Sequence, residues 1–234
     1  MNPARQQLRQ RIASGPTFWF AGAQDALSAL LVDQSDFDGI FTTGFGISAS
    51  LLGQPDMELY TLSENVAAVN RIANVVRKPI FADADTGYGN VLNVARTVRE
   101  FEKAGVSAIS LEDQVSPKRC PAAATHSIVV PVQDAVARIQ AAVDARQDPD
   151  LLIVARTDAM DRGEAFERAA RYAEAGADLV QPIGARVPLW RILKMRRRPV
   201  GAFDFPGIDP IGRGQREHEP RAAGLGPLQG VVGR

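Results

Sequence analysis

Apolar and polar positions follow two alternating patterns along most of this chain. Short, mostly apolar runs are typical of buried strands, and between them apolar residues recur every three or four positions, as in amphipathic helices. One such helical face carries Val94, Val98, Phe101 and Ala104. The predicted strands are Thr17–Ala21, Gly39–Thr43, Pro79–Asp83, Ala108–Leu111, Leu151–Ala155 and Asp178–Ile183. The predicted helices are Asp25–Asp33, Ser63–Val76, Val91–Ala104, Val132–Ala145 and Gly163–Ala175.

This alternation predicts the fold class. Strands that are apolar on both faces and separated by helices are typical of a parallel sheet covered on both sides. About six βα units favour an α/β fold of the (β/α) TIM-type barrel kind over an open sheet. Three segments at helix ends, Lys103–Val106, Glu174–Ala177 and Ser35–Gly39, each contain a glycine that we expect to form a left-handed helix cap.

The pattern changes after Ile183. Residues 184–234 contain nine Arg, one Lys and four acidic residues, together with nine Gly and six Pro. We therefore expect residues 1–183 to form a barrel catalytic domain and residues 184–234 to form a mostly irregular Arg/Gly/Pro-rich tail. The barrel is expected to be incomplete, with strands seven and eight missing and at most one short helix near Pro188–Met195.

Composition narrows the classes of partner and compartment. The 234 residues are 45% hydrophobic and carry zero formal net charge, which argues against binding to nucleic acid or to an anionic membrane. No apolar run approaches the roughly 18 residues that span a bilayer, and the N-terminus lacks the apolar segment of a signal peptide. The single cysteine, Cys120, suits a reducing compartment, so a cytoplasmic location is expected.

The clearest candidate for chemistry follows the third predicted strand. Asp83 and Asp85 lie two positions apart and precede a Gly-rich turn. Side chains at this spacing on a strand share a face, and two ionised carboxylates this close repel each other unless a cation lies between them. A hard divalent metal is the obvious cation, and the alternative is a turn capped by aspartate.

Further polar residues follow the neighbouring strands. Glu112 follows the fourth strand and Arg156 the fifth, and the carboxyl ends of barrel strands converge on one face. After the second strand, Thr43, Gly44 and Phe45 form either an anion-binding turn or a simple glycine turn. The same turn loosely matches a dinucleotide fingerprint, but the following segment, with Gly53, is expected to break the helix that such a site needs.

The loop after the fourth strand holds Cys120. Two cations, Lys118 and Arg119, precede the cysteine and would stabilise its thiolate. The alternative is that Cys120 is a small buried hydrophobe. His126, in the same loop, is expected to be a solvated histidine.

Four motifs together resemble the isocitrate lyase/phosphoenolpyruvate mutase superfamily. They are Ala82-Asp83-Ala84-Asp85-Thr86-Gly87-Tyr88-Gly89, Ser110-Leu111-Glu112-Asp113-Gln114, Pro117-Lys118-Arg119-Cys120 and Ile153-Val154-Ala155-Arg156-Thr157-Asp158-Ala159. The resemblance covers roughly residues 10–180, and the Lys-Arg-Cys motif is similar to that of the methylisocitrate lyase-like branch. It implies a Mg²⁺-dependent lyase that cleaves a carbon–carbon bond in a small 2-hydroxy or alkyl-malate-type acid.

The resemblance also implies roles for individual residues. Asp83 and Asp85 would hold Mg²⁺, and Glu112 would steady the metal-bound waters or an enolate. The substrate carboxylate would bind to backbone N–H groups of Thr43, Gly44 and Phe45 and to the Arg156 guanidinium. Cys120 would act as the general acid and base. The expected partners are a small carboxylic-acid substrate and, as in the family, further copies of the chain in a homo-oligomer.

Two departures from the family pattern keep other functions open. The loop reads Cys120-Pro121 where these lyases have Cys-Gly-His, and Ile183 occupies the position of a glutamate after the sixth strand. An oxaloacetate-type decarboxylase or a P–C bond mutase would use the same metal site without the cysteine loop. A third interpretation is an inactive, truncated remnant of such an enzyme, and the Arg-rich tail would then reflect a shifted reading frame.

Overall fold

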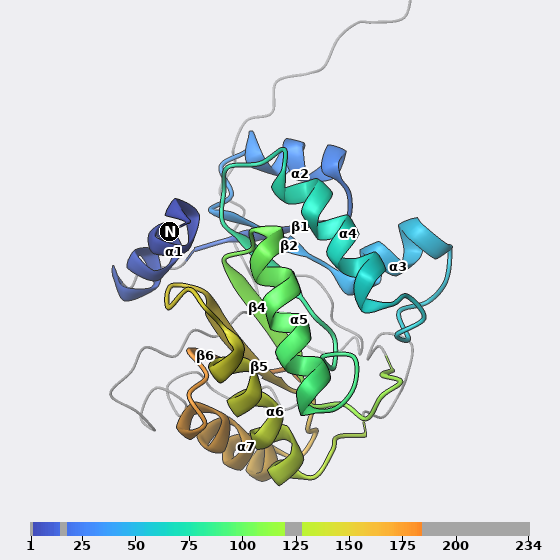
Figure 1. Ribbon diagram of the computed structural model, residues 1–234, viewed down its shortest axis with the longest axis vertical. Coiled ribbons are helices and arrows are strands. Elements are labelled where there is room, and N and C mark those ends of the chain that lie inside the picture. Colours follow the sequence, from blue (N-terminus) through green and yellow to red (C-terminus); the bar gives the residue numbers. More distant parts are fainter. Residues whose placement is uncertain (1, 15–17, 120–127, 184–234) are drawn as a thin grey trace, which may run out of the picture. The chain divides into compact units, whose positions relative to one another are not determined.

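A parallel sheet of six strands forms the centre of the computed structural model (Figure 1). The structure describes residues 2–14, 18–119 and 128–183. These residues lie in the first of two units of the chain, Met1–Asp204, and none lies in the second, Phe205–Arg234. The predictions for residues 184–234, including the tail and the missing strands, therefore fall outside the described residues.

The strands follow one another in space in the same order as in the sequence. Every neighbouring pair is parallel, in the order β1-β2-β3-β4-β5-β6. The strands are β1 (Phe20–Ala23), β2 (Gly39–Thr42), β3 (Ile80–Asp83), β4 (Ala108–Glu112), β5 (Leu152–Thr157) and β6 (Leu179–Pro182). This confirms the predicted α/β barrel-type fold with about six βα units, although β1 begins three residues later than expected.

Helices connect successive strands, and α2 and α4–α7 lie against the outer face of the sheet, whereas α1 precedes β1 and packs on the inner core (Figure 1). In the described residues they are α1 (Pro3–Ser14), α2 (Ala26–Asp33), α3 (Gly44–Leu52), α4 (Leu62–Ala73), α5 (Val91–Ala104), α6 (Val132–Ala145) and α7 (Arg162–Glu174). Two of them, α1 and α3, were not predicted. The helix break expected at Gly53 is confirmed, because Gly53 ends α3 with φ +62°, although the nine helical residues before it were not expected.

Alternate residues of each strand serve two different cores. In β3, Ile80 and Ala82 pack outward with Val94, Val98 and Phe101 of α5 in the larger core. Between them, Phe81 faces the other way, into a smaller core inside the curve of the sheet. That inner core also contains Ala108, Leu152, Val154 and Leu179, with Leu8 of α1 packed on it. The period of two thus assigns each strand residue to the inner or the outer layer.

Polar anchors hold α1 in place, which is why hydrophobic periodicity missed it. Arg5 is 5% exposed and donates from Nε to Val106 O at 2.8 Å and from Nη2 to Glu102 O at 2.7 Å. Its Nη1 lies 2.8 Å from Asp148 Oδ2. An arginine that satisfies three acceptors at the end of α5 and in the loop before β5 fixes a helix that contributes few apolar side chains.

Two of the three predicted glycine caps are confirmed and one is wrong. Gly105 (φ +96°) and Gly176 (φ +104°) adopt the left-handed conformation at the ends of α5 and α7. Gly39 instead begins β2, and α2 ends at Asp33 with a right-handed cap at Gln34. Glycine is required at position 39 for space, since a Cβ there would lie 2.3 Å from Cε1 of the Phe20 ring.

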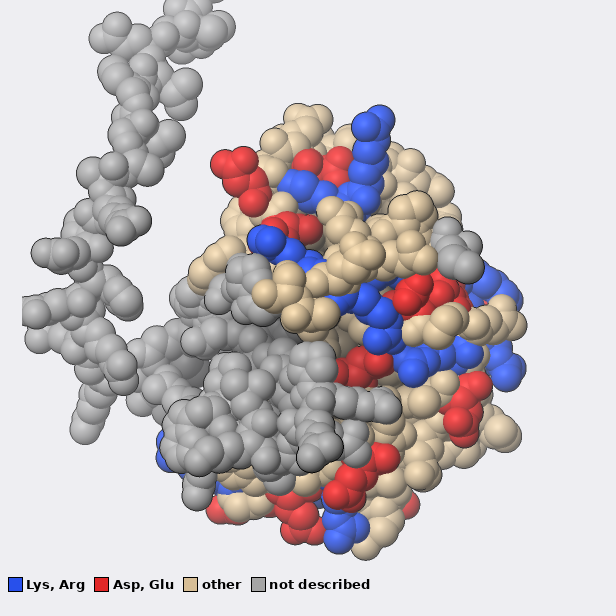
Figure 2. Space-filling view, turned by 90° about the vertical axis from the view of Figure 1, so that its left-hand side faces the viewer, with Lys and Arg blue, Asp and Glu red and all other residues tan. Residues whose placement is uncertain are grey.

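Acidic and basic side chains are interspersed on the face shown in Figure 2, without a large region of one sign among the residues drawn in colour. In the part of the chain that the structure describes, no helix combines the length and the apolar character needed to cross a membrane.

The contact between Gly39 and Phe20 gives a first prediction. Gly39→Ala should lower the free energy of unfolding by about 1–3 kcal/mol, the usual penalty for overpacking a core. Gly22→Ala, in the neighbouring strand, is the control, because its Cβ would meet Thr43 Cγ2 at an ordinary 3.7 Å. Urea denaturation measures both. In a Phe20→Leu background the cost of Gly39→Ala should shrink, and a cost that is unchanged there would contradict this explanation.

Candidate functional site

The carboxyl ends of β3, β4 and β5 bring acidic and basic side chains together on the inner face of the sheet. Asp83 pairs in register with Ser110, and Glu112 pairs with Arg156. Asp83 and Glu112 lie two and four positions beyond the inner-core residues Phe81 and Ala108, so they continue the same face. The structure therefore brings together the predicted site residues of three strands.

The turn after β3 holds Asp85 beside Asp83. Asp85 has φ +52°, and its N–H donates to Asp83 Oδ1 at 3.3 Å. The Tyr88 hydroxyl donates to Asp85 Oδ2 at 2.5 Å, and Asn65 Nδ2 lies 2.8 Å from the Tyr88 oxygen and 3.0 Å from Asp83 O. The predicted proximity of the two aspartates is confirmed, and a tyrosine and an asparagine fix their turn.

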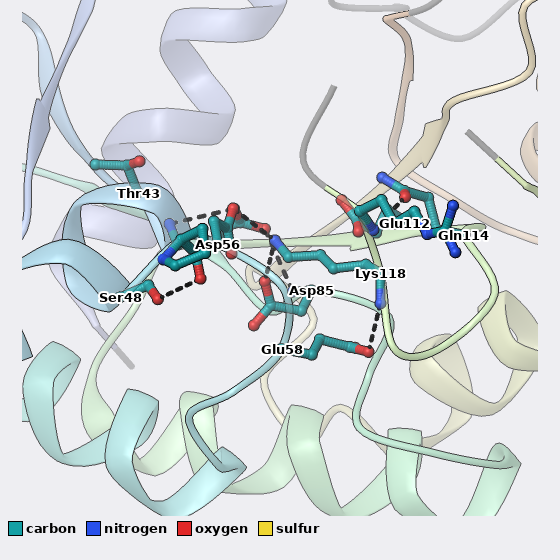
Figure 3. A network of polar contacts seen from close by, with 12 residues as sticks. Thr43, Ser48, Asp56, Glu58, Asp85, Glu112, Gln114 and Lys118 are labelled. Atoms are coloured by element: carbon teal, nitrogen blue, oxygen red, sulfur yellow. Dashed lines mark hydrogen bonds and ion pairs between the residues drawn. The ribbon is translucent and has the colours of Figure 1, made fainter. Parts of the chain in front are cut away.

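Lys118 supplies the cation that balances these acids. Its Nζ lies 2.5 Å from Asp85 Oδ1 and 3.0 Å from Asp56 Oδ2, so the ammonium bridges two carboxylates (Figure 3). Burial lowers the pKa of Lys118, but Asp83, Asp85, Glu112 and Asp56 raise it more strongly, to well above its usual value. Burial raises the pKa of Asp85, and the ammonium opposes that shift. Lys118 is therefore a charged residue at 2% exposure.

Glu58 holds the backbone that carries this lysine. Its Oε2 accepts from Lys118 N at 3.0 Å (Figure 3) and from Ser116 Oγ at 2.6 Å, and its Oε1 accepts from the Thr86 hydroxyl. Glu58 itself adopts φ +54°. One carboxylate thus connects the segment after β4 to the turn that carries Asp85.

The predicted anion-binding turn lies at the start of α3. Thr43 is the N-cap, and its hydroxyl accepts from Gly46 N at 3.3 Å. The Gly44 N–H donates to Asp83 Oδ2 at 3.3 Å, and Phe45 is 57% exposed. A Cβ on Gly44 would lie 2.7 Å from the Tyr60 hydroxyl and 3.1 Å from Asp83 Oδ2. Gly44 is therefore a glycine because the site leaves no room for a side chain.

Arg156 lies between two carboxylates at the end of β5. Its Nη1 is 2.8 Å from Glu112 Oε2, and its Nη2 donates to Asp158 Oδ1 at 2.8 Å. Burial lowers the pKa of Arg156, but Asp158 and Glu112 raise it more. Burial also raises the pKa of Glu112, against the opposing effects of Arg156 and Lys118. Arg156 Nε is buried without a hydrogen-bond partner, which leaves a donor available in the site.

The donor atoms of the site suit a hard metal ion. In the described residues no three Asp, Glu, His or Cys side chains converge closely enough to hold a metal. The available oxygens are nevertheless those that Mg²⁺ prefers. Glu112 Oε1 accepts no hydrogen bond in the described part of the chain, while Oε2 pairs with Arg156, and the Lys118 ammonium already places a positive charge against Asp85. The oxygens of Asp83, Asp85 and Glu112 therefore match the donor chemistry of such an ion, although the three carboxylates do not converge on one point.

Sequence reasoning missed several members of the site. Asp56, Glu58 and Tyr60 precede α4 and reach the site from a segment without a recognisable pattern. Lys118 was interpreted as a cation beside Cys120, whereas its ammonium pairs with Asp56 and Asp85. Cys120 and His126 lie outside the described residues, so the roles expected for them stay predictions, as does the metal role of Asp83 and Asp85.

Comparison with known proteins places this geometry in a family. The family model of phosphoenolpyruvate phosphomutase matches residues 8–198. The chain is 47% identical over 183 residues to 2,3-dimethylmalate lyase of Eubacterium barkeri, a match that covers 77% of this chain and 63% of that protein. It is 40% identical over 179 residues to 2-methylisocitrate lyase of Shewanella oneidensis, covering 74% and 60%. Oxaloacetate decarboxylases are also among the relatives.

A solved relative shows what one such fold binds. The structure of a phosphonopyruvate hydrolase in complex with oxalate and Mg²⁺ matches with a TM-score of 0.74 and 32% identity, covering 85% of this chain and 70% of that chain. The chain spans less than two thirds of the length of the two lyases above. On these matches, and with acids and an arginine gathered at the carboxyl ends of its strands, the chain belongs to the phosphoenolpyruvate mutase/isocitrate lyase superfamily.

Proposed function

We propose that this protein is a Mg²⁺-dependent carbon–carbon lyase for a small 2-hydroxy or alkyl-malate-type acid, similar to methylisocitrate lyase. The observation that carries the proposal is the pairing of buried acids with two cations, the buried Lys118 and the partly buried Arg156, at the carboxyl ends of β3–β5. Its relatives include lyases that act on dimethylmalate and methylisocitrate.

Each side chain has a role that its contacts support. Arg156 binds a substrate carboxylate, since its guanidinium is held at both terminal nitrogens and keeps Nε unpartnered. The first turn of α3 would offer the same anion the N–H of Phe45, while the Gly44 N–H donates to Asp83 Oδ2. Asp83 and Asp85, with Glu112 beside them, would hold Mg²⁺, which supplies Lewis-acid stabilisation of negative charge on an oxygen.

Proton transfer belongs to Cys120 in this proposal. Cleavage of the bond beside the carbinol carbon of a 2-hydroxy acid removes the hydroxyl proton and turns that carbon into the carbonyl of an α-keto acid. The electron pair of the broken bond passes to the other carboxylate fragment as an enolate, and a proton must then reach the enolate carbon. A thiol is suited to that step near neutral pH. An oxaloacetate-type decarboxylase or a P–C bond enzyme is the second candidate, because relatives with those activities share the matched region.

Turnover assays test the proposal directly. The full chain with Mg²⁺ should release an α-keto acid from at least one member of a panel of methylisocitrate, dimethylmalate and isocitrate. Cys120→Ser should reduce this activity by about 100-fold or more, since a hydroxyl is a much weaker acid and base. Release of keto acid from oxaloacetate alone, unaffected by Cys120→Ser, would replace the lyase with the decarboxylase.

Metal binding has its own test. Millimolar Mg²⁺ should raise the melting temperature of the wild-type chain, because a ligand that binds the native state stabilises it by mass action. Asp85→Asn should abolish the shift. Asp134→Asn, an exposed carboxylate in the first turn of α6, is the control and should leave it intact. A wild-type melting curve that Mg²⁺ does not move would count against the metal site.

Lys118→Met should weaken the metal-free protein and strengthen its metal binding. Removing the ammonium leaves buried carboxylates uncompensated, which costs about 3–5 kcal/mol for a broken buried pair. The same excess negative charge should lower the dissociation constant for Mg²⁺. Urea denaturation and calorimetric titration measure the two effects, with Lys103→Met, whose side chain is 72% exposed, as the matched control. Equal stability of the Lys118 and Lys103 variants would show that Lys118 does not balance the cluster.

A further inference from the structure

A second buried carboxylate, Asp113, lies directly beside Glu112 but faces away from the site. Asp113 Oδ2 accepts from the Tyr172 hydroxyl at 2.6 Å and lies 3.3 Å from Arg168 Nη1. Its Oδ1 accepts from the Asp158 N–H at 3.0 Å. Asp113 is 3% exposed, and neither the metal nor the substrate contacts proposed above use it.

The partners of Asp113 come from one face of α7. Arg168 and Tyr172 are four residues apart, so they share that face, and they are 5% and 1% exposed. Arg168 also donates from Nη2 to Val130 O at 2.9 Å and from Nε to Glu164 Oε1 at 2.9 Å. The outer helix α7 therefore holds the end of β4 through directed hydrogen bonds.

These contacts continue into the site through Asp158. Asp113 fixes the backbone N–H of Asp158, and the Asp158 carboxylate accepts from Arg156 Nη2. Arg156 in turn lies against Glu112, the chain neighbour of Asp113. The contacts thus form a closed ring across β4 and β5 that runs from Asp113 to Asp158, Arg156 and Glu112.

Directed hydrogen bonds hold this geometry. Only a small space adjoins the ring, lined by Glu112, Asp113, Arg156 and Tyr172, among other residues. A guanidinium that hydrogen bonds hold in one rotamer can change its orientation when one of those bonds is lost. Loss of the Tyr172 hydroxyl would therefore change the orientation of the Arg156 guanidinium, through the contacts of Asp113 and Asp158.

We propose that Tyr172, Arg168 and Asp113 are positioning residues that orient the Arg156 guanidinium toward the carboxylate of the bound acid. This inference rests on the proposed role of Arg156 as the substrate carboxylate clamp. The three residues touch no reacting atom, and their effect reaches Arg156 through Asp158 and through Glu112, the chain neighbour of Asp113.

Binding of oxalate in the presence of Mg²⁺ tests the inference without requiring turnover. Tyr172→Phe removes one hydroxyl and should weaken oxalate binding by about tenfold, the size of one hydrogen bond's effect. In an Arg156→Lys background the same change should have little further effect, because both substitutions act on the same contact. Arg168→Gln should behave like Tyr172→Phe. Arg171→Gln is the control, because Arg171 lies on the same helix with a 46% exposed side chain, and it should leave oxalate binding unchanged.

The outcomes separate positioning from mere stability and from the proposed function. If Tyr172→Phe lowers only the melting temperature, or weakens oxalate equally in both backgrounds, the positioning role is overturned. A wild-type chain that binds oxalate no better than Arg156→Lys also overturns it. The two substitutions could be coupled in their effect on oxalate affinity while the chain cleaves none of the acids tested. That result would support the positioning role and contradict the lyase proposal. Where turnover is measured, Tyr172→Phe should raise KM more than it lowers kcat.

Discussion

The site depends on the balance of charge in a buried space. Asp83, Asp85, Glu112 and Asp158 are at most 6% exposed, so their ionised forms are costly unless cations lie close by. Two side chains supply that charge, the Lys118 ammonium and the Arg156 guanidinium. Each of the two makes contact with two carboxylates, and the rest of the site is arranged around those four contacts.

Backbone geometry supports this balance at a few strained or crowded points. Asp85 and Glu58 adopt positive φ without being glycine, which costs free energy that their side-chain contacts must offset. Glu58 does so with bonds to Ser116 and Lys118, and Asp85 with its bond to Tyr88. Strain of this kind is common where side-chain placement matters for chemistry. It occurs here in the two turns that face Lys118.

Sequence patterns predicted the features that local spacing determines. Positions at the ends of the predicted strands identified Asp83, Glu112 and Arg156, and the helical period identified α5 and α6 to the residue. The patterns failed where residues far away in the sequence determine the structure. Position 39 needs glycine because of Phe20, α1 is held by the polar contacts of Arg5, and the acids that meet Lys118 lie 33 and 62 positions before it. The residues next to Lys118 in the sequence do not indicate that its partners are Asp56 and Asp85.

The ring formed by Asp113, Asp158, Arg156 and Glu112 also bears on how such barrels can be rearranged. A βα unit is often treated as an exchangeable module, with chemistry in its loop and stability in its helix. Here α7 follows β5, yet its Arg168 and Tyr172 bind the end of β4. A chimaera that received β5 with Arg156 but a different following helix would therefore lack Arg168 and Tyr172, which orient the guanidinium through Asp113. The smallest segment that could be transferred with this site intact includes β4, β5 and α7.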